Sequence, residues 1–181
     1  MSQVKALFLD RDGIINVDHG YVSKIEDFTF SEGIFELLYL FKQEGYLLFV
    51  VTNQSGIGRN YYTQDDFEIL TKWMIKTFAE QNIVIEKVSY CPHSPENNCL
   101  CRKPATGMID VILEEYNIDL SASWLIGDKQ SDIDLAHNSH IKHSIAIGTN
   151  DIKNSEYHFN SIYACYNYLK VHKDIIQSKV N

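Results

Sequence analysis

Short apolar segments with strand character alternate with segments of helical periodicity along the chain. This alternation predicts an α/β fold, a doubly wound and mostly parallel sheet with helices on both faces. Strands are expected at residues 6–9, 46–52, 85–91, 123–127 and 143–147, and helices at 35–44, 63–81, 108–116, 132–139 and from residue 157 onward. A chain of 181 residues is long enough for one well-buried core, so we expect a single domain, 1–181.

Composition and charge exclude several classes of partner. Hydrophobic residues make up 45% of the chain and charged residues 22%, as is usual for folded globular proteins. The formal net charge of −8 argues against a general affinity for nucleic acids or anionic membranes, since both require a surplus of lysine and arginine. No apolar run approaches the ~20 residues that a membrane span needs, and the N-terminal segment lacks signal-peptide features. We therefore expect a cytoplasmic protein with no nucleic-acid or membrane partner, and a monomer is the default expectation.

Polar motifs follow three of the expected strands. Asp10 and Asp12 end the first strand in LFLDRDGIIN, Thr52 and Asn53 end the second in VVTNQSGIGR, and Asp128 ends the fourth in LIGDKQSD. Taken alone, DRDG is typical of a turn, because Asp caps its own backbone and Gly accepts a positive φ. Ligands of parallel sheets gather beyond the carboxyl ends of the strands. Together the motifs therefore indicate one common site.

With Lys103 in CRKP, these motifs resemble, in order, the four motifs of the haloacid dehalogenase (HAD) superfamily of aspartate-nucleophile phosphatases, from about residue 8 to about residue 148. The resemblance implies a Rossmann-like sheet with a minimal cap. It also implies that Asp10 is the nucleophile and Asp12 the general acid and base. Two carboxylates are required because one attacks phosphorus and forms an aspartyl phosphate, while the other moves protons.

The resemblance further implies a catalytic Mg²⁺, which would offset the charges of carboxylate and phosphate. Its expected ligands are Asp10, the backbone carbonyl of Asp12, and Asp128. Asp132 is expected to orient these ligands rather than to bind the metal. The alternative for Asp132 is an acidic residue favoured in the first turn of a helix by the helix dipole.

Phosphate binding is assigned to residues that follow the second strand and to one lysine. Thr52 and Asn53 would hold phosphate oxygens through a hydroxyl and exposed backbone N–H groups. Lys103 would supply positive charge to the transferred phosphoryl group. The alternative for Lys103 is a solvated surface lysine.

A second cluster lies in CPHSPENNCLCRKP, which occupies residues 91–104. Three thiolates and one imidazole form a set that Zn²⁺ prefers in closed structural sites, and here they are Cys91, His93, Cys99 and Cys101. A redox dithiol or reduced free cysteines are the alternatives. We expect a structural zinc loop at 91–104, whose folding fixes Arg102 and Lys103 beside the phosphate.

A zinc loop in a small, nearly capless member is similar to the HAD subgroup that contains D-glycero-D-manno-heptose 1,7-bisphosphate 7-phosphatases and histidinol-phosphatases. The short interval from His93 to Cys99 is similar to histidinol-phosphatases. The motifs CRKPATGM, NVDHGYV and GDKQSD, the last with Lys129, are similar to the heptose enzymes, and we favour these.

This choice implies a role in the biosynthesis of ADP- or GDP-heptose for lipopolysaccharide or surface polysaccharide. The resemblance thus implies that the partner is a small phosphorylated metabolite, a sugar bisphosphate. Its second phosphate requires further cations, for which Arg59, Arg102 and Lys129 are candidates. The alternatives are a histidinol-phosphate phosphatase of histidine biosynthesis and, from a different class, a catalytically silent zinc-loop binding protein.

Overall fold

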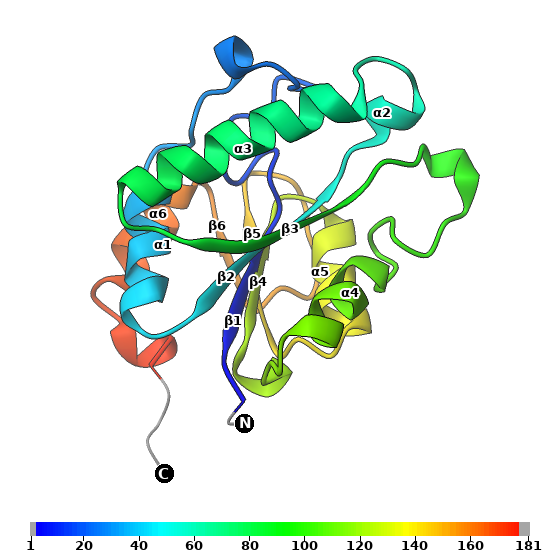
Figure 1. Cartoon of the computed structure of the whole chain (residues 1–181). Coiled ribbons are helices and arrows are strands. Elements are labelled where there is room, and N and C mark those ends of the chain that lie inside the picture. Colours follow the sequence, from blue (N-terminus) through cyan, green and yellow to red (C-terminus); the bar gives the residue numbers. More distant parts are fainter. Residues whose placement is uncertain (1–2, 178–181) are drawn as a thin grey trace.

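A central six-stranded sheet forms the middle layer of the protein, in a computed structural model that describes residues 3–177 (Figure 1). The strands are β1 (Ala6–Leu9), β2 (Leu47–Asn53), β3 (Ile85–Cys91), β4 (Trp124–Gly127), β5 (His143–Ile147) and β6 (Tyr157–Phe159). They pair in the order β3-β2-β1-β4-β5-β6, and every neighbouring pair is parallel. The predicted parallel sheet is confirmed, with its first five strands within one residue of the expected positions.

Helices cover both faces of the sheet. They are α1 (Ile34–Gln43), α2 (Ser55–Gly58), α3 (Gln64–Glu80), α4 (Gly107–Glu115), α5 (Gln130–Asn138) and α6 (Ile162–Leu169), with short 3-10 helices at Ile25–Asp27, Pro95–Asn97, Leu120–Ala122 and Lys173–Ile175. Figure 1 shows α1, α3 and α6 on one side of the sheet and α4 and α5 on the other. Within residues 3–177, no helix combines the length and apolarity needed to cross a bilayer.

The central strand β1 contributes side chains to the apolar core on both faces of the sheet. Its four residues are fully buried, because parallel strands with helices on both faces lose the usual alternation of apolar and polar residues. Leu7 and Leu9 pack in the cluster that contains α1, α3 and α6, whereas Ala6 and Phe8 pack in the cluster that contains α4 and α5. A single apolar strand thus links both halves of the core.

The expected helix from residue 157 onward is wrong at its start. Residues Tyr157–Phe159 form the edge strand β6, which pairs with β5 through Ile145 opposite Tyr157. Tyr157 and Phe159 turn the same way and pack on the core, as the two-residue period of a strand requires. The helix α6 begins only after Ser161, whose Oγ accepts a hydrogen bond of 3.1 Å from the N–H of Ala164 and caps it.

The helix α2 was not expected from the sequence. It follows β2 directly and spans four residues, Ser55–Gly58. The other expected helices agree with the structure to within one or two residues at each end. Because β2, β1 and β4 are neighbours in the sheet, their carboxyl ends bring the segments after Asn53, Leu9 and Gly127 to one edge.

Candidate active site

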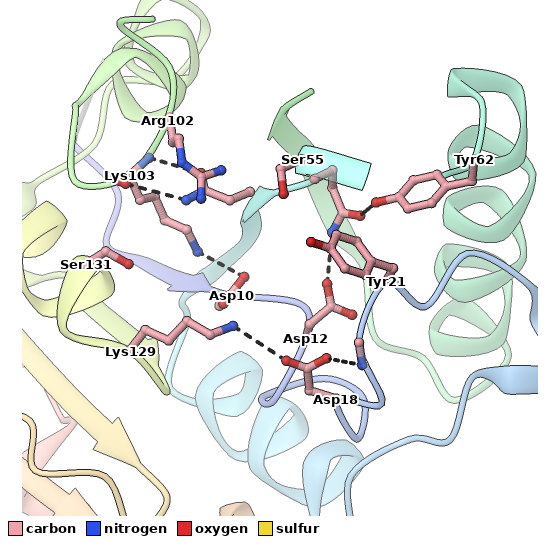
Figure 2. A pocket seen from close by; sticks show the side chains of 13 residues that line it. Asp10, Asp12, Asp18, Tyr21, Ser55, Tyr62, Arg102, Lys103, Lys129 and Ser131 are labelled. Carbon is pink, nitrogen blue, oxygen red and sulfur yellow. Dashed lines mark hydrogen bonds and ion pairs between the residues drawn. The ribbon is translucent and has the colours of Figure 1, made fainter. Parts of the chain in front are cut away.

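A cavity of about 340 Å³ opens at this edge of the sheet (Figure 2). Its walls come from the loop after β1, the segment after β2, the Cys/His-rich loop at residues 91–104 and the start of α5. The lining residues used below are Asp10, Asp12, Asp18, Asn53, Gln54, Tyr62, Arg102, Lys103 and Lys129. Six of the predicted site residues are therefore in the cavity wall: Asp10, Asp12, Asn53, Arg102, Lys103 and Lys129.

Asp10 lies at the bottom of this cavity with only 4% of its surface exposed. Its Oδ1 accepts a hydrogen bond from the backbone N–H of Arg11 at 2.7 Å and contacts Lys103 Nζ at 2.9 Å. Burial raises the pKa of Asp10, the Lys103 ammonium opposes this, and the nearby Asp132 carboxylate adds to the rise. The charge of Asp10 is thus stabilised chiefly by Lys103.

Lys103 is buried and has three acceptors around its ammonium. Nζ lies 2.9 Å from Asp10 Oδ1, 2.6 Å from Asp132 Oδ1 and 3.0 Å from the carbonyl oxygen of Val51. Burial would lower the pKa of Lys103, but Asp10 and Asp132 together raise it above its usual value. The alternative of a solvated surface lysine is therefore wrong, because the side chain is buried and its ammonium contacts two carboxylates.

Asp128 completes a cluster of carboxylates with Asp10 and Asp132, in which one oxygen of each lies within 4.8 Å of the others. Asp128 Oδ1 is buried and has no hydrogen-bond partner among the described residues. Burial, followed by the charge of Asp10, raises the pKa of Asp128 to about 7. Gly13, with φ of +86°, makes the approach possible, because a Cβ there would lie 2.2 Å from Asp128 Oδ2.

These observations show that the donor set fits a hard divalent cation such as Mg²⁺. Carboxylate and carbonyl oxygens are the ligands that such ions prefer. An unpartnered buried oxygen beside a second carboxylate is stable only when a proton or a cation joins it.

Asp132 has both carboxylate oxygens engaged. Oδ1 contacts Lys103, and Oδ2 accepts hydrogen bonds from the N–H groups of Asp128 at 3.1 Å and Lys129 at 3.0 Å. Asp132 also lies in the first turn of α5. The two expectations for Asp132, an orienting residue and an acidic residue in the first turn of a helix, are thus compatible. From its position at the start of α5, the carboxylate contacts Lys103 and the backbone of the loop that carries Asp128.

Asp12 occupies a different environment from Asp10. Its Oδ1 and Oδ2 lie 2.9 and 3.0 Å from Arg11 Nη2, its Oδ1 accepts from Asn16 Nδ2 at 3.1 Å, and its Oδ2 accepts from Gln54 Nε2 at 2.9 Å. Arg11 is itself buried, and Nη2 also donates to the carbonyl oxygen of Val22 at 2.6 Å. The side chain of Asp12 is thus held apart from the carboxylate cluster of Asp10, Asp128 and Asp132.

The residues at the end of β2 and directly after it differ in their contacts in a way that the sequence did not predict. Thr52 is fully buried, is not among the cavity-lining residues, and accepts a hydrogen bond from Gln54 Nε2 at 2.9 Å. Asn53 lines the cavity, and its Oδ1 accepts from the N–H of Lys103 at 3.0 Å. Gln54 lies in the wall where a contact from Thr52 was expected. Phosphate binding by Thr52 stays a prediction.

Of the three predicted cationic residues, two line the cavity and one does not. Arg102 and Lys129 line the cavity, and Figure 2 shows Lys129 directed toward Asp18, whose Oδ2 lies 3.6 Å from Nζ. Burial opposes the charge of Lys129, but Asp128, Asp10 and Asp18 raise its pKa. Arg59 is not among the lining residues. It follows α2 on the exposed side and pairs with Glu96 of the Cys/His-rich loop at 3.5 Å.

The four predicted zinc ligands converge beside the cavity. Cys91 Sγ lies 2.8 Å from Cys101 Sγ and 3.4 Å from Cys99 Sγ, and His93 Nδ1 lies 3.2 Å from Cys101 Sγ. Burial disfavours the Cys99 thiolate, but hydrogen bonds from Cys91, Cys101 and the backbone hold its pKa at about 6. Three sulfurs and one imidazole whose ligand atoms all lie within 4.8 Å of one another form a donor set that suits a tetrahedral Zn²⁺.

This cluster is anchored to the sheet. Cys91 is the last residue of β3 and lies opposite Asn53 of β2, and its carbonyl oxygen accepts from the N–H of Gln54 at 2.8 Å. Arg102 and Lys103 follow Cys101 directly. An ordered loop therefore sets the position of both cations at the cavity.

Sequence reasoning missed Arg11 and Gln54. Gln54 stands directly after the two residues chosen in VVTNQS, so its position after a strand was an available signal. Arg11 stands between Asp10 and Asp12 in the sequence, and a cation between two predicted catalytic carboxylates was also a signal.

Comparisons with known proteins agree with this architecture. The HAD-hydrolase-like family model matches residues 100–161. The D-glycero-beta-D-manno-heptose-1,7-bisphosphate 7-phosphatase of Helicobacter pylori is 48% identical over 154 residues, covering 84% of this chain and 89% of that protein. The D-glycero-alpha-D-manno-heptose-1,7-bisphosphate 7-phosphatase of Campylobacter jejuni is 50% identical over 139 residues, covering 77% and 80%.

A solved structure shares the fold. The D,D-heptose 1,7-bisphosphate phosphatase of B. bronchiseptica, complexed with magnesium and phosphate, superposes with a TM-score of 0.81 at 24% identity and covers 93% of this chain and 99% of that one. With this fold, the order of the four motifs and the identity to the curated relatives, the chain belongs to the heptose-1,7-bisphosphate phosphatase family of HAD-like hydrolases.

Proposed function

We propose that this protein hydrolyses the 7-phosphate of D-glycero-D-manno-heptose 1,7-bisphosphate through an aspartyl phosphate on Asp10. The observation that carries the proposal is the pair of carboxylates with separate surroundings. Asp10 lies with Lys103 and the Asp128 carboxylate, whereas Asp12 is held by Arg11, Asn16 and Gln54. Relatives at 48% and 50% identity carry the name of this activity, which supports the choice of substrate. They give no support to the histidinol-phosphatase alternative.

The two carboxylates perform complementary steps. Asp10 attacks phosphorus, the bond between phosphorus and the 7-oxygen breaks, and the leaving oxygen takes a proton from Asp12. Asp12, now a carboxylate, removes a proton from a water molecule that attacks the aspartyl phosphate. Inorganic phosphate leaves, and both aspartates return to their initial state. Lys103 neutralises charge at the transferred group throughout. A binding protein without turnover would have no use for the second carboxylate, which disfavours that alternative.

Two metal ions would complete the site. Asp10, the backbone carbonyl of Asp12 and Asp128 would hold Mg²⁺, which when bound neutralises phosphoryl oxygens and acts as a Lewis acid. The magnesium and phosphate in the B. bronchiseptica protein support this assignment. The loop at residues 91–104 would hold Zn²⁺ through its four ligands and so fix Arg102 and Lys103.

The second phosphate of the substrate accounts for cations that hydrolysis itself does not need. Arg102 and Lys129 line the same cavity as Asp10 and would bind the 1-phosphate, Arg102 through its planar fork and Lys129 as a point charge. The product would be a heptose 1-phosphate. We place this reaction in the cytoplasm, in the supply of activated heptose for lipopolysaccharide or surface polysaccharide.

The test is a side-by-side measurement of kcat/KM on heptose 1,7-bisphosphate, as both anomers, and on histidinol phosphate, with magnesium and zinc present. We expect strong preference for the heptose, and loss of turnover in Asp10→Asn. Asp65→Asn, at an exposed position in the first turn of α3, is the matched control and should retain turnover. A preference for histidinol phosphate would contradict the substrate, and unimpaired turnover in Asp10→Asn would contradict the nucleophile.

A further inference from the structure

A hydrogen-bond chain links the catalytic carboxylate Asp12 to a buried tyrosine. The hydroxyl of Tyr62 donates to Gln54 Oε1 at 2.5 Å, and Gln54 Nε2 donates to Asp12 Oδ2 and Thr52 Oγ1, both at 2.9 Å. Figure 2 shows Tyr62 and Asp12 approaching the same side chain from two sides of the cavity. The chain therefore joins the segment before α3 to the residue that moves protons.

The order of donors in this chain fixes how the Gln54 amide is turned. In the ionised form, in which Asp12 acts as the base, its oxygens only accept hydrogen bonds, so the side of the amide that faces this form of Asp12 is its NH₂ group. The opposite orientation would place the amide oxygen against Asp12 Oδ2, and the two oxygens would repel. Tyr62 selects the favourable orientation because its hydroxyl donates to the amide oxygen on the far side.

The side chain of Tyr62 is held in place by close packing. Its ring is buried and fits against Gly56, where an added Cβ would lie 2.1 Å from Cε1 of the ring. Burial, partly offset by Arg11, raises the pKa of Tyr62 to about 12, so the hydroxyl keeps its proton across the working pH range. The hydroxyl is thus available as a donor whenever the enzyme is active.

The orientation of Asp12 depends on donors on both of its oxygens. Asn16 donates to Oδ1, Arg11 contacts both oxygens, and Gln54 donates to Oδ2. Without Gln54, only the guanidinium of Arg11 remains at Oδ2, and the carboxylate gains freedom to turn about its last torsion. Proton transfer requires a separation of about 2.6–3.2 Å between heavy atoms, so a turned carboxylate slows that step.

We propose that Gln54, held in one orientation by Tyr62, is the positioning residue that fixes the Asp12 carboxylate for proton transfer. This inference rests on the proposed function, in which Asp12 is the acid and base. It assigns a role to Tyr62, which the hydrolytic scheme leaves without one, and it states what the contact of Gln54 with Asp12 does.

The test uses the leaving group as the readout, in enzyme with magnesium and zinc present. Release of the leaving group in a single turnover is measured for the sugar bisphosphate, whose alkoxide needs a proton, and for p-nitrophenyl phosphate, whose phenolate leaves without one. Gln54→Met should slow release from the sugar substrate by roughly 10- to 100-fold, because a misplaced acid loses part of the roughly 10²- to 10⁴-fold that acid catalysis contributes. Release from the aryl substrate should slow by less than about threefold. Tyr62→Phe should slow the sugar reaction by about 3- to 10-fold, because the amide keeps its contact with Asp12 for part of the time.

A double variant tests whether Tyr62 and Gln54 act through one hydrogen-bond chain or independently of each other. Because Tyr62 acts only through Gln54, Tyr62→Phe should cause no further loss in the Gln54→Met background, whereas independent residues would give additive losses. Tyr61→Phe is the matched control, because it removes the hydroxyl of the neighbouring, exposed tyrosine and should leave both reactions unchanged. If Gln54→Met does not fold, Tyr62→Phe alone still tests the dependence on the leaving group.

Two results would overturn the inference. Equal losses with both substrates would indicate a general structural effect, and additive losses in the double variant would exclude a chain through Gln54. Asp12→Asn distinguishes this failure from failure of the proposed function. If Asp12→Asn lacks the dependence on the leaving group, the acid assignment is wrong; if it has the dependence and Gln54→Met does not, only the positioning role is wrong.

Discussion

Asp128→Asn is expected to stabilise the magnesium-free protein above neutral pH while it abolishes magnesium-dependent hydrolysis. The carboxylate lies in a buried cluster with Asp10 and Asp132, and its Oδ1 has no hydrogen-bond partner among the described residues. Burial and the charge of Asp10 raise the pKa of Asp128 from 3.8 to about 7. An amide of the same shape carries no charge and removes this cost.

The size and sign of the effect follow from proton linkage. Between about pH 4 and pH 7 the folded state binds more protons at Asp128 than the unfolded state, so the stability of the metal-free wild type falls as pH rises through this range. A rise in pKa from 3.8 to about 7 corresponds to at most about 4 kcal/mol, at about 1.36 kcal/mol per pH unit. The side chain is 17% exposed, so water screens part of this energy and we expect about 1–3 kcal/mol above pH 7.

Urea denaturation in magnesium-free buffer, with zinc retained, measures this difference. The advantage of Asp128→Asn over the wild type should grow from about pH 4 to about pH 7 and then level off. Asp134→Asn is the control, on the helix α5 that follows Asp128. Asp134 Oδ1 accepts from Gln130 at 2.9 Å, and this change should alter stability by less than about 0.5 kcal/mol. An advantage that is absent, or that does not vary with pH, would refute the reasoning.

Three further predictions concern the same edge of the sheet. Lys103→Met leaves Asp10 and Asp132 buried without their counter-charge, so urea denaturation at neutral pH should show a loss of about 3–5 kcal/mol. Chelation of zinc should increase hydrogen exchange in the loop at residues 91–104, while calorimetry shows that magnesium still binds; an unchanged loop would contradict the structural role. Gly13→Ala places a Cβ 2.2 Å from Asp128 Oδ2 and should weaken magnesium binding at least about tenfold by calorimetry.

The convergence of Asp10 and Asp128 could be predicted from the sequence because it follows from the topology, whereas Lys103 was assigned to the site by the resemblance to the HAD motifs. Apolar strands that alternate with helices form a parallel sheet, and β1 and β4 are neighbours in it, so the residues after each strand meet. The zinc ligands could be predicted for a similar reason, since a short segment holds all four and their spacing limits how far apart they can lie.

Side-chain pairing within the site could not be predicted in the same way. Thr52 lies in β2 and Gln54 directly follows this strand. Both are buried, and only packing decides that Gln54 lines the cavity while Thr52 does not. Arg59 had no local signal for its pairing with Glu96 of the distant loop. The edge strand β6 was missed because three residues are too few for a period of two to stand out from the aromatic stretch that continues into α6.

The charge balance at the carboxylate cluster connects stability with function. Asp10, Asp128 and Asp132 carry three negative charges when ionised, and Lys103 is the cation that contacts two of them, with Lys129 Nζ 4.0 Å from Asp128. Without a metal, a proton relieves this excess, since burial and then the charge of Asp10 raise the pKa of Asp128. A divalent cation would displace that proton and balance the charge. The phosphate dianion could then approach Asp10 without facing uncompensated carboxylates, so the arrangement that destabilises the metal-free protein is the one that binding of metal and substrate requires.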